Sequence, residues 1–326
     1  MTNEPHRTIK IWQQNTRKSL DAQLLTLHAA QNNYDIICIQ EPHFDHLNAT
    51  QATPVWRLVT PTGWNRNDPV ERTPRAIILV HERIPTNSWT QIDIESLDAV
   101  GIKLVGEAAE ISIYNLYNDC THSDTTSKLQ EHLDAREQAN PDPATDDRII
   151  GDIWLGDFNR HHPMWEDEEN ARLFTHQNLN EASILIDLLA DHDMQMALPH
   201  GIPTIRNSAG NLTRPDNVFA SAQLADWVTK CDTRPDDQPP TADHFPISTS
   251  IDFPITTNPT QTPRNFRATD WEELKEILDE ELMDLEPPRE LNSKEELIKA
   301  LDSLEAAIMR TIEKVVPRKK PSPYAK

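Results

Sequence analysis

The sequence places two polar side chains directly after a pattern typical of a buried strand. The apolar run from Ile153 to Gly156 ends in Asp157, and Asn159 follows two residues later. On an extended chain, residues two apart point to the same side, so the carboxylate and the carboxamide would face one spot. Such a pair can orient a water molecule and hydrogen-bond a phosphate oxygen. A strand end followed by an Asn-containing turn is the alternative.

Other polar residues stand at the ends of predicted strands and loops, and together they fit one chemistry. Hydrolysis of a phosphodiester needs a hard cation, a positioned and deprotonated water, and a partner for the developing charge. Mg²⁺ accepts one or two carboxylates plus waters. A carboxylate beside a histidine fixes the imidazole and raises its pKa. Each residue alone has an alternative as a cap or turn residue; the residues concerned are Asn15, Glu41, Tyr117, Asp157, Asn159, Asp216, Asp243 and His244.

Six motifs in a fixed order resemble the endonuclease/exonuclease/phosphatase superfamily. The nearest resemblance is to the apurinic-type endonuclease domain of non-LTR, LINE-like retrotransposons, above all fungal ones, because Gly-Asp-Phe-Asn-Arg-His-His-Pro-x-Trp begins at Gly156. The resemblance covers roughly residues 8–252. The motifs are Gln13-Gln14-Asn15, Gln40-Glu41, Asn115-Leu116-Tyr117, Gly156-Asp157-Phe158-Asn159, Arg214-Pro215-Asp216 and Ala242-Asp243-His244-Phe245-Pro246-Ile247.

The resemblance implies an α/β fold, a DNase-I-like four-layer α/β sandwich with two packed mixed β-sheets flanked by helices. It places the active site at the top of the two sheets. It also implies a bound Mg²⁺, or Mn²⁺ in its place, with Glu41 as the metal ligand. Asn15 would sit beside the metal and phosphate, and Asp243 would complete the acidic cluster near the metal.

The same resemblance assigns roles to the catalytic residues. Asp157 would orient or deprotonate the attacking water, and Asn159 would hold a phosphate oxygen. Tyr117 would donate to the phosphate, and Asp216 would pair with His244. The expected product is a nick in DNA that leaves a 3′-hydroxyl, which such elements use to prime reverse transcription.

Two positions depart from the family pattern. Pro215 stands where an apolar residue is usual, and its missing N–H could shift the strand that carries Asp216. Ala242 replaces a frequent Ser, which would remove one supporting hydrogen bond to the site. Neither change removes a catalytic group, so the sequence predicts a competent site.

Basic and aromatic residues near the motifs are candidates for substrate contacts. Arg160, Arg206 and Arg214 are expected to form a local rim facing DNA, with ordinary surface charge as the alternative. For His161 and His162, a structural or phosphate-contacting role is favoured over metal binding, because the family metal prefers oxygen ligands. The indoles are expected in the core or at the rim of the site; they are Trp12, Trp56, Trp154 and Trp165.

The bulk properties limit the classes of function. The 326 residues carry a formal charge of −22, which argues against a general nucleic-acid coat or a binder of anionic membranes. No apolar stretch approaches the length of a membrane span, and the first residues do not resemble a signal peptide. Three widely spaced cysteines suggest a reducing compartment, with Cys38 buried. We therefore expect a nuclear or cytoplasmic protein that is not secreted.

The hydrophobic pattern predicts the elements that position the motifs. A strand over 8–15, a helix over 18–32 and a buried strand over 34–42 form a βαβ-like opening, with Leu20, Leu24, Leu27 and Ala30 as the apolar face of the helix. Strands are predicted at 55–60, 75–82, 99–105, 110–118, 153–157, 195–198, 204–206, 217–221, 226–232 and 247–251, and helices at 124–140 and 178–193. The run from Glu166 to Glu169 is expected to be a solvated loop. Many short strands favour two packed sheets.

The composition changes after Phe253. We expect the domain to cover residues 1–253, a Thr- and Pro-rich linker 254–264, and a helical extension 265–326. The extension is predicted to hold two charged amphipathic helices, 270–285 and 293–316, with Asp270 and Ser293 as N-caps. It resembles the helical connector that precedes the reverse transcriptase in such polyproteins, although no Tyr/Phe-x-Asp-Asp polymerase motif is present. The helices could contact the main domain or a partner.

Two alternatives to a DNA endonuclease stay open. One is a lipid or small-molecule phosphoesterase of the same superfamily, although the inositol-phosphatase signatures are missing. There, Thr213-Arg214-Pro215-Asp216 replaces a Trp-Cys-Asp-Arg type segment. The other is a non-catalytic relic or binding module that works through its C-terminal helices. The sequence does not fix the target site, which would lie in variable loops such as 61–74 and 200–212.

Overall fold

The computed structural model describes residues 8–67, 72–106, 109–139, 148–253, 264–283, 285, 287, 289–290 and 293–318. The chain divides into two compact units, Met1–Asn258 and Pro259–Lys326. The turn predicted at 141–147, nearly all of the 254–264 linker and the basic tail after Arg318 lie outside the described residues.

The first sheet has the order β13-β14-β1-β2-β4-β3 and carries the N-terminal motifs. β1 and β2 run parallel, and the other neighbours are antiparallel. The strands are β1 Thr8–Asn15, β2 Ile36–Gln40, β3 Trp56–Val59, β4 Ala76–His81, β13 Val228–Thr233 and β14 Ile247–Asp252.

The second sheet has the order β5-β6-β7-β8-β12-β9 and carries the remaining strand-borne motifs. β7 and β8 are its parallel pair. The strands are β5 Trp89–Ile92, β6 Ala99–Val105, β7 Ala109–Tyr117, β8 Ile149–Asp157, β9 Met194–Met196 and β12 Asp216–Ser221. A separate hairpin joins β10 Ile205–Arg206 to β11 Leu212–Thr213. The strands β5 and β11 were not predicted from the sequence.

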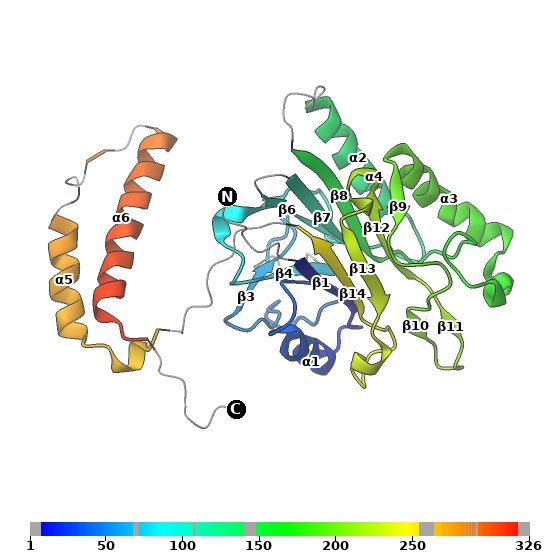
Figure 1. Ribbon diagram of the computed structural model, residues 1–326, viewed down its shortest axis with the longest axis horizontal. Helices are drawn as coiled ribbons and strands as arrows, with labels where there is room; N and C mark the ends of the chain where they lie inside the picture. Colours follow the sequence, from blue (N-terminus) through cyan, green and yellow to red (C-terminus); the bar gives the residue numbers. More distant parts are fainter. Residues whose placement is uncertain are drawn as a thin grey trace. The chain divides into compact units, whose positions relative to one another are not determined.

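Three apolar clusters separate the layers. One lies between the sheets, where Ile36 and Cys38 of β2 meet Ile153 and Leu155 of β8. A second lies between the second sheet and the helices α2 Asp124–Ala139 and α3 His176–Asp191, and a third lies between the first sheet and α1 Leu20–Ala30. Figure 1 shows α2 and α3 beside the second sheet. The arrangement confirms the predicted four-layer sandwich. A short helix, α4 Ala222–Ala225, follows β12.

The apolar face predicted for the first helix is wrong in part. Leu27 and Ala30 are buried, but Leu20 and Leu24 are exposed. The buried face instead includes Gln23, which donates to Thr50 and to the carbonyl of Gln51, and Thr26, which donates to the buried Gln14. Buried polar groups with hydrogen-bond partners are tolerated in a core, so apolar spacing alone pointed to the wrong side of the helix.

Buried amides connect the two sheets near the motif-bearing strand ends. Gln13 of β1 donates to the carbonyl of Gly156 in β8 at 3.0 Å. Gln40 of β2 donates to Asn115 of β7, and Asn115 in turn donates to the carbonyl of Ile39 at 3.0 Å. A buried polar group without a partner is costly, so these bonds fix how the sheets align. The motif amides therefore hold the scaffold of the site.

The C-terminal unit is a helical hairpin of α5 Trp271–Met283 and α6 Lys294–Val315. Glu281 joins the helices through ion pairs with Arg310 and Lys314 at 2.6 and 2.7 Å. The predicted N-caps are confirmed, because Asp270 accepts from the amide of Glu273 and Ser293 accepts from that of Glu296. None of the described helices in the chain has the length and apolar character needed to cross a membrane.

Candidate active site

The strand register brings the motif residues to neighbouring strand ends. Asn15 ends β1 opposite Gln40 of the parallel strand β2, and Glu41 follows directly. In the second sheet, Tyr117 ends β7 beside Asp157 at the end of β8, and Asp216 begins β12 opposite Asp157. A hydrogen bond from Asn15 to Asp157 at 2.9 Å joins the two sets of strand ends. Residues predicted from far-apart motifs thus meet.

Two motif residues have the left-handed backbone that side chains rarely adopt. Glu41 has φ of 46° and Asn159 has φ of 49°. Such conformations cost free energy and persist where the surroundings impose them, often at functional sites. The close approach of Gly156 to β7 is the other constraint, because an added Cβ there would lie 2.0 Å from the carbonyl oxygen of Leu116. Only glycine fits at that position.

Asp157 is buried and held at both of its oxygens. Oδ2 accepts from Asn15 at 2.9 Å, and Oδ1 accepts from the backbone amide of Asn159 at 3.1 Å. Burial, followed by the charge of Asp216, raises the pKa of Asp157 to about 7. A carboxylate with such a pKa can accept a proton near neutral pH and still exist partly in the ionised form.

Asp216 and His244 form the predicted buried pair. Nδ1 of His244 lies 2.8 Å from Oδ2 of Asp216. Burial lowers the pKa of His244, but the charge and hydrogen bond of Asp216 outweigh it, and the net effect raises the pKa to about 9. The imidazole is therefore cationic at neutral pH, which suits a group that stabilises negative charge on a phosphate.

Thr204 supports this pair and was not foreseen from the sequence. Its hydroxyl donates to Oδ2 of Asp216 at 2.7 Å and accepts from the backbone amide of Asp216 at 3.2 Å. It lies just before β10 in a loop that carried no motif. The structure thus supplies a second donor to Asp216, at a position other than Ala242.

Pro215 does not displace the strand that carries Asp216. It stands one residue before β12, and its carbonyl accepts from the amide of Phe158 at 3.0 Å. Asp216 still faces Asp157 in register. Because the ladder begins after the proline, its missing N–H removes no strand bond, and the expected shift does not occur.

The residues predicted to bind metal differ from the Asp216–His244 pair in how they are bonded. No described residue donates a hydrogen bond to the carboxylate of Glu41, which is half-buried. Asp243 pairs with Arg17 through Oδ2 at 2.9 Å, while its buried Oδ1 lies 4.0 Å from Nε2 of His244 and accepts no hydrogen bond from the described residues. Carboxylate oxygens that lack donors fit an oxygen-preferring cation such as Mg²⁺. Asn15 uses its amide on Asp157, so it also orients that residue.

A second place could also hold an ion. Among the described residues, the ligand atoms of Asp157, Asp216 and His244 lie within 4.8 Å of one another. The donor set fits a metal less well there, because His244 shares its Nδ1 proton with Asp216 and carries a raised pKa. A protonated imidazole cannot act as a ligand.

Tyr117 and Asn159 lie beside these groups. Burial raises the pKa of Tyr117, and the charges of Glu41 and Asp157 raise it further. The phenol therefore stays protonated and can donate a hydrogen bond. Asn159 donates one amide proton to the carbonyl of Asn118 at 2.8 Å. A side-chain amide has two such protons, so one stays available for a phosphate oxygen.

The predicted DNA-facing rim needs correction at two of its three arginines. Arg160 is 3% exposed and donates to four backbone carbonyls, including those of His122 and Glu181. Arg214 is 1% exposed and donates to carbonyls that include Leu198 at 2.7 Å. Both organise loops, because buried guanidiniums need their donors satisfied. Arg206 is exposed and stays a candidate for DNA contact.

In the acidic run after the Gly-Asp-Phe-Asn motif, Asp167, Glu168 and Glu169 are exposed as expected, and Glu166 is the exception. Glu166 is buried rather than solvated, and it accepts from His161 at 2.6 Å and from the amide of Arg214 at 3.0 Å. His162 packs against Trp165 with ring centroids 5.4 Å apart. These contacts support the structural role favoured for the two histidines. The four predicted core indoles are all buried.

Comparisons with known proteins agree with this geometry. Residues 111–248 match a family model of the exonuclease–endonuclease–phosphatase type, described as "Endonuclease-reverse transcriptase". A search of curated proteins found no match.

Solved structures show the same fold at low identity. One is the endonuclease domain of TRAS1, a telomere-specific non-LTR retrotransposon, with 18% identity, a TM-score of 0.54, and coverage of 74% of this chain and 98% of that one. Another is the AP endonuclease LMAP from Leishmania major, with 14% identity, a TM-score of 0.56, and coverage of 77% and 90%. A third is the 3′ phosphatase NExo (D146N) from Neisseria bound to product DNA hairpin, with 14% identity, a TM-score of 0.50, and coverage of 75% and 100%.

The fold is the one found in these solved structures, and it carries a buried cluster of Asp157, Asp216 and His244. Over residues 111–248 the chain is similar to the family described as "Endonuclease-reverse transcriptase".

Proposed function

We propose that the protein is a Mg²⁺-dependent DNA endonuclease that nicks a target strand and leaves a 3′-hydroxyl, as in retrotransposon integration. The observation that carries the proposal is the buried Asp157, held by Asn15 and Asn159 beside the hydrogen-bonded Asp216–His244 pair. The likeness to the TRAS1 endonuclease domain supports the retrotransposon setting.

The site residues divide the chemistry between them. Asp157 accepts a proton from water as the water oxygen bonds to phosphorus, and the bond from phosphorus to the 3′ oxygen breaks. The electron pair goes to that oxygen, which takes a proton from solvent water to become the 3′-hydroxyl, and the other end of the nick carries a 5′-phosphate. Cationic His244 stabilises negative charge on the phosphate, and Asp216 fixes its ring. A Mg²⁺ held by Glu41 and Asp243 would supply Lewis-acid neutralisation of the phosphate.

Tyr117 and Asn159 would hold the phosphate oxygens that do not leave. Each has a donor available in the structure, a neutral phenol and one free amide proton. Exposed Arg206 on the β10–β11 hairpin is proposed as a backbone contact with DNA. The net charge of −22 implies that non-specific affinity is weak and that contacts are local.

Nicking of supercoiled plasmid tests the proposal. The protein is incubated with plasmid in Mg²⁺ or in chelator, beside a His244→Ala variant. Metal-dependent nicking that the variant lacks is the expected result, and extension of the nick by a DNA polymerase would show the 3′-hydroxyl. Turnover of a small phosphoester without nicking would support the phosphoesterase alternative, and a folded protein with no turnover would support a binding module.

A further inference from the structure

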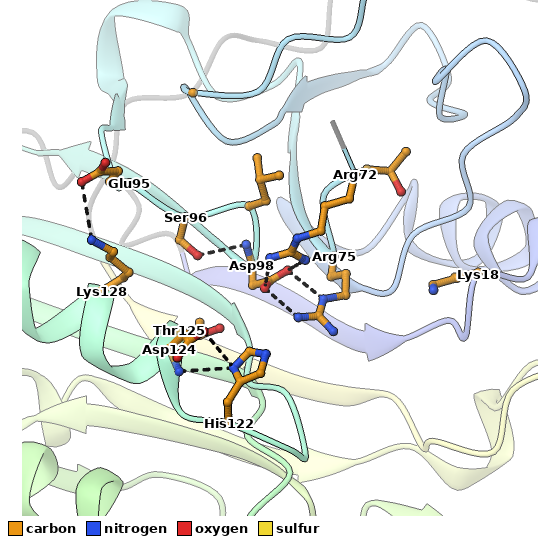
Figure 2. Close-up of a pocket in the computed structure, with 13 residues that line it drawn as sticks. Lys18, Arg72, Arg75, Glu95, Ser96, Asp98, His122, Asp124, Thr125 and Lys128 are labelled. Carbon is orange, nitrogen blue, oxygen red and sulfur yellow. Dashed lines mark hydrogen bonds and ion pairs between the residues drawn. The ribbon is translucent and has the colours of Figure 1, made fainter. Parts of the chain in front are cut away.

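Arg75 lies directly before β4 and is clamped by two carboxylates. Its Nε and Nη2 donate to Asp98 at 2.8 and 2.7 Å, and its Nη1 donates to Asp119. Arg72 also pairs with Asp98, at 2.6 Å. Figure 2 shows both guanidiniums meeting Asp98 at the wall of a pocket of about 830 Å³. Burial raises the pKa of Asp98, but the hydrogen bonds of Arg75 and Arg72 outweigh it and lower that pKa.

The clamped guanidinium stacks on a residue of the candidate active site. Its carbon atom lies 4.6 Å from the centre of the Tyr117 ring. A cation over an aromatic face is attracted to the ring, and the attraction grows when both groups are shielded from water. The side chain of Arg75 is 18% exposed, so the contact is largely shielded. Arg75 thus restricts the orientation of the Tyr117 ring, and Asp98 and Asp119 restrict Arg75.

The backbones of the same two residues hold the active site from both sheets. The carbonyl of Arg75 accepts from the amide of Glu41 at 2.8 Å. The carbonyl of Asp98 accepts from the amide of Tyr117, also at 2.8 Å. One ion pair therefore joins the backbone that carries the proposed metal ligand to the backbone that carries the phenol.

A role in binding phosphate fits Arg75 less well. Two carboxylates accept from all three of its guanidinium nitrogens, so three of its five N–H groups are used and its positive charge is already paired with two negative charges. Arg72, with 53% of its side chain exposed, is the more accessible of the two arginines, but it does not stack on Tyr117. Arg75 is therefore the buried arginine that contacts the Tyr117 ring, and Arg72 is the exposed one that lines the pocket.

We propose that Arg75 is a positioning residue, which holds the Tyr117 ring so that its hydroxyl points at the scissile phosphate, and which is itself held by Asp98 and Asp119. The inference rests on the proposed function. It predicts that Arg75 acts on the rate through the hydroxyl of Tyr117 and not through substrate affinity.

A double-mutant cycle in the full chain tests this role. Arg75→Lys keeps the charge but cannot donate to both carboxylates, so we expect kcat for nicking to fall about tenfold with KM changed less than about twofold. In a Tyr117→Phe background, which keeps the ring and removes the hydroxyl, the same substitution should change kcat less than about twofold. Arg72→Lys is the matched control, because it alters the same carboxylate without touching the ring, and it should leave kcat within about twofold.

An equal loss from Arg75→Lys in both backgrounds would overturn the proposal, and so would an equal loss from Arg72→Lys. Thermal unfolding of each variant separates loss of fold from loss of rate. If Arg75→Lys does not fold, Asp119→Asn replaces it in the cycle, since it loosens the clamp from the other side. Absence of nicking by the wild-type chain would count against the proposed function, whereas normal nicking by Arg75→Lys would count against the positioning role alone.

Discussion

The two halves of the candidate site differ in how completely the protein satisfies their carboxylates. On one side, Asp157 and Asp216 receive hydrogen bonds from Asn15, Asn159, Thr204 and His244. On the other side, Glu41 receives none from the described residues, and one oxygen of Asp243 also lacks a donor. The difference indicates that hydrogen bonds within the protein orient Asp157 and Asp216 for proton transfer. The free oxygens of Glu41 and Asp243 are instead suited to coordinating a cation.

Removing the Asp157 carboxylate should have the largest effect on nicking. Asp157→Asn keeps the size of the side chain but cannot accept a proton from water, so we expect nicking to fall by roughly 10²–10⁴-fold. The rate of plasmid nicking at saturating Mg²⁺ measures this, with thermal unfolding as the check on folding. Nicking within tenfold of wild type would remove Asp157 from the proton-accepting role.

Substitutions at Glu41 and Asp243 should instead change how nicking depends on the Mg²⁺ concentration. We expect Glu41→Gln to raise the Mg²⁺ concentration for half-maximal nicking by about tenfold or more, because a neutral amide is a poorer ligand for a hard cation. Asp243→Asn should raise it less, since one Asp243 oxygen already pairs with Arg17. Mg²⁺ titrations of both variants make the comparison, and an unchanged titration for Glu41→Gln would place the metal elsewhere.

A substitution at Thr204 tests how much activity depends on its hydrogen bond to Asp216. Thr204→Val keeps the size of the side chain but removes its hydroxyl, so Asp216 loses one hydrogen-bond donor. Loss of one buried hydrogen bond to a charged group is worth about 1.5–3 kcal/mol, so we expect nicking to fall by roughly 10- to 150-fold. Thr204→Ser is the matched control and should retain most activity. Equal activity of the two variants would show that the donor is dispensable.

The Asp216–His244 pair should also make the stability of the fold depend on pH, which is measured in chelator. The folded pKa of His244 is raised to about 9, so between its unfolded value near 6.5 and 9 the folded chain holds a proton that the unfolded chain has lost. This contribution to stability is complete below pH 6.5 and disappears as the pH rises to 9. Asp216→Asn, which removes the charge beside the imidazole, should flatten the fall of Tm across that window. A parallel fall in both proteins would assign it to other groups.

Much of the fold could be predicted because the relevant patterns are local. Alternating or continuous apolar runs located most of the strands, and caps at Asp270 and Ser293 located the C-terminal helices. The predictions of burial were wrong where a residue from another segment forms a hydrogen bond with the side chain. Gln23 and Thr26 are buried by the partners they meet, and Glu166 is buried by His161 and the amide of Arg214.

The sequence by itself determined the types and order of the site residues, from Asn15 to His244, and with them the class of chemistry. Only the tertiary structure decided which of them are satisfied, because their partners lie far along the chain: Asn15 is 142 residues from Asp157, and Asp216 is 28 from His244. It also decided that Arg160 and Arg214 are internal and that Arg75 stacks on Tyr117. Burial and hydrogen bonding depend on all the elements packed around a side chain, and periodicity within one segment does not contain that information.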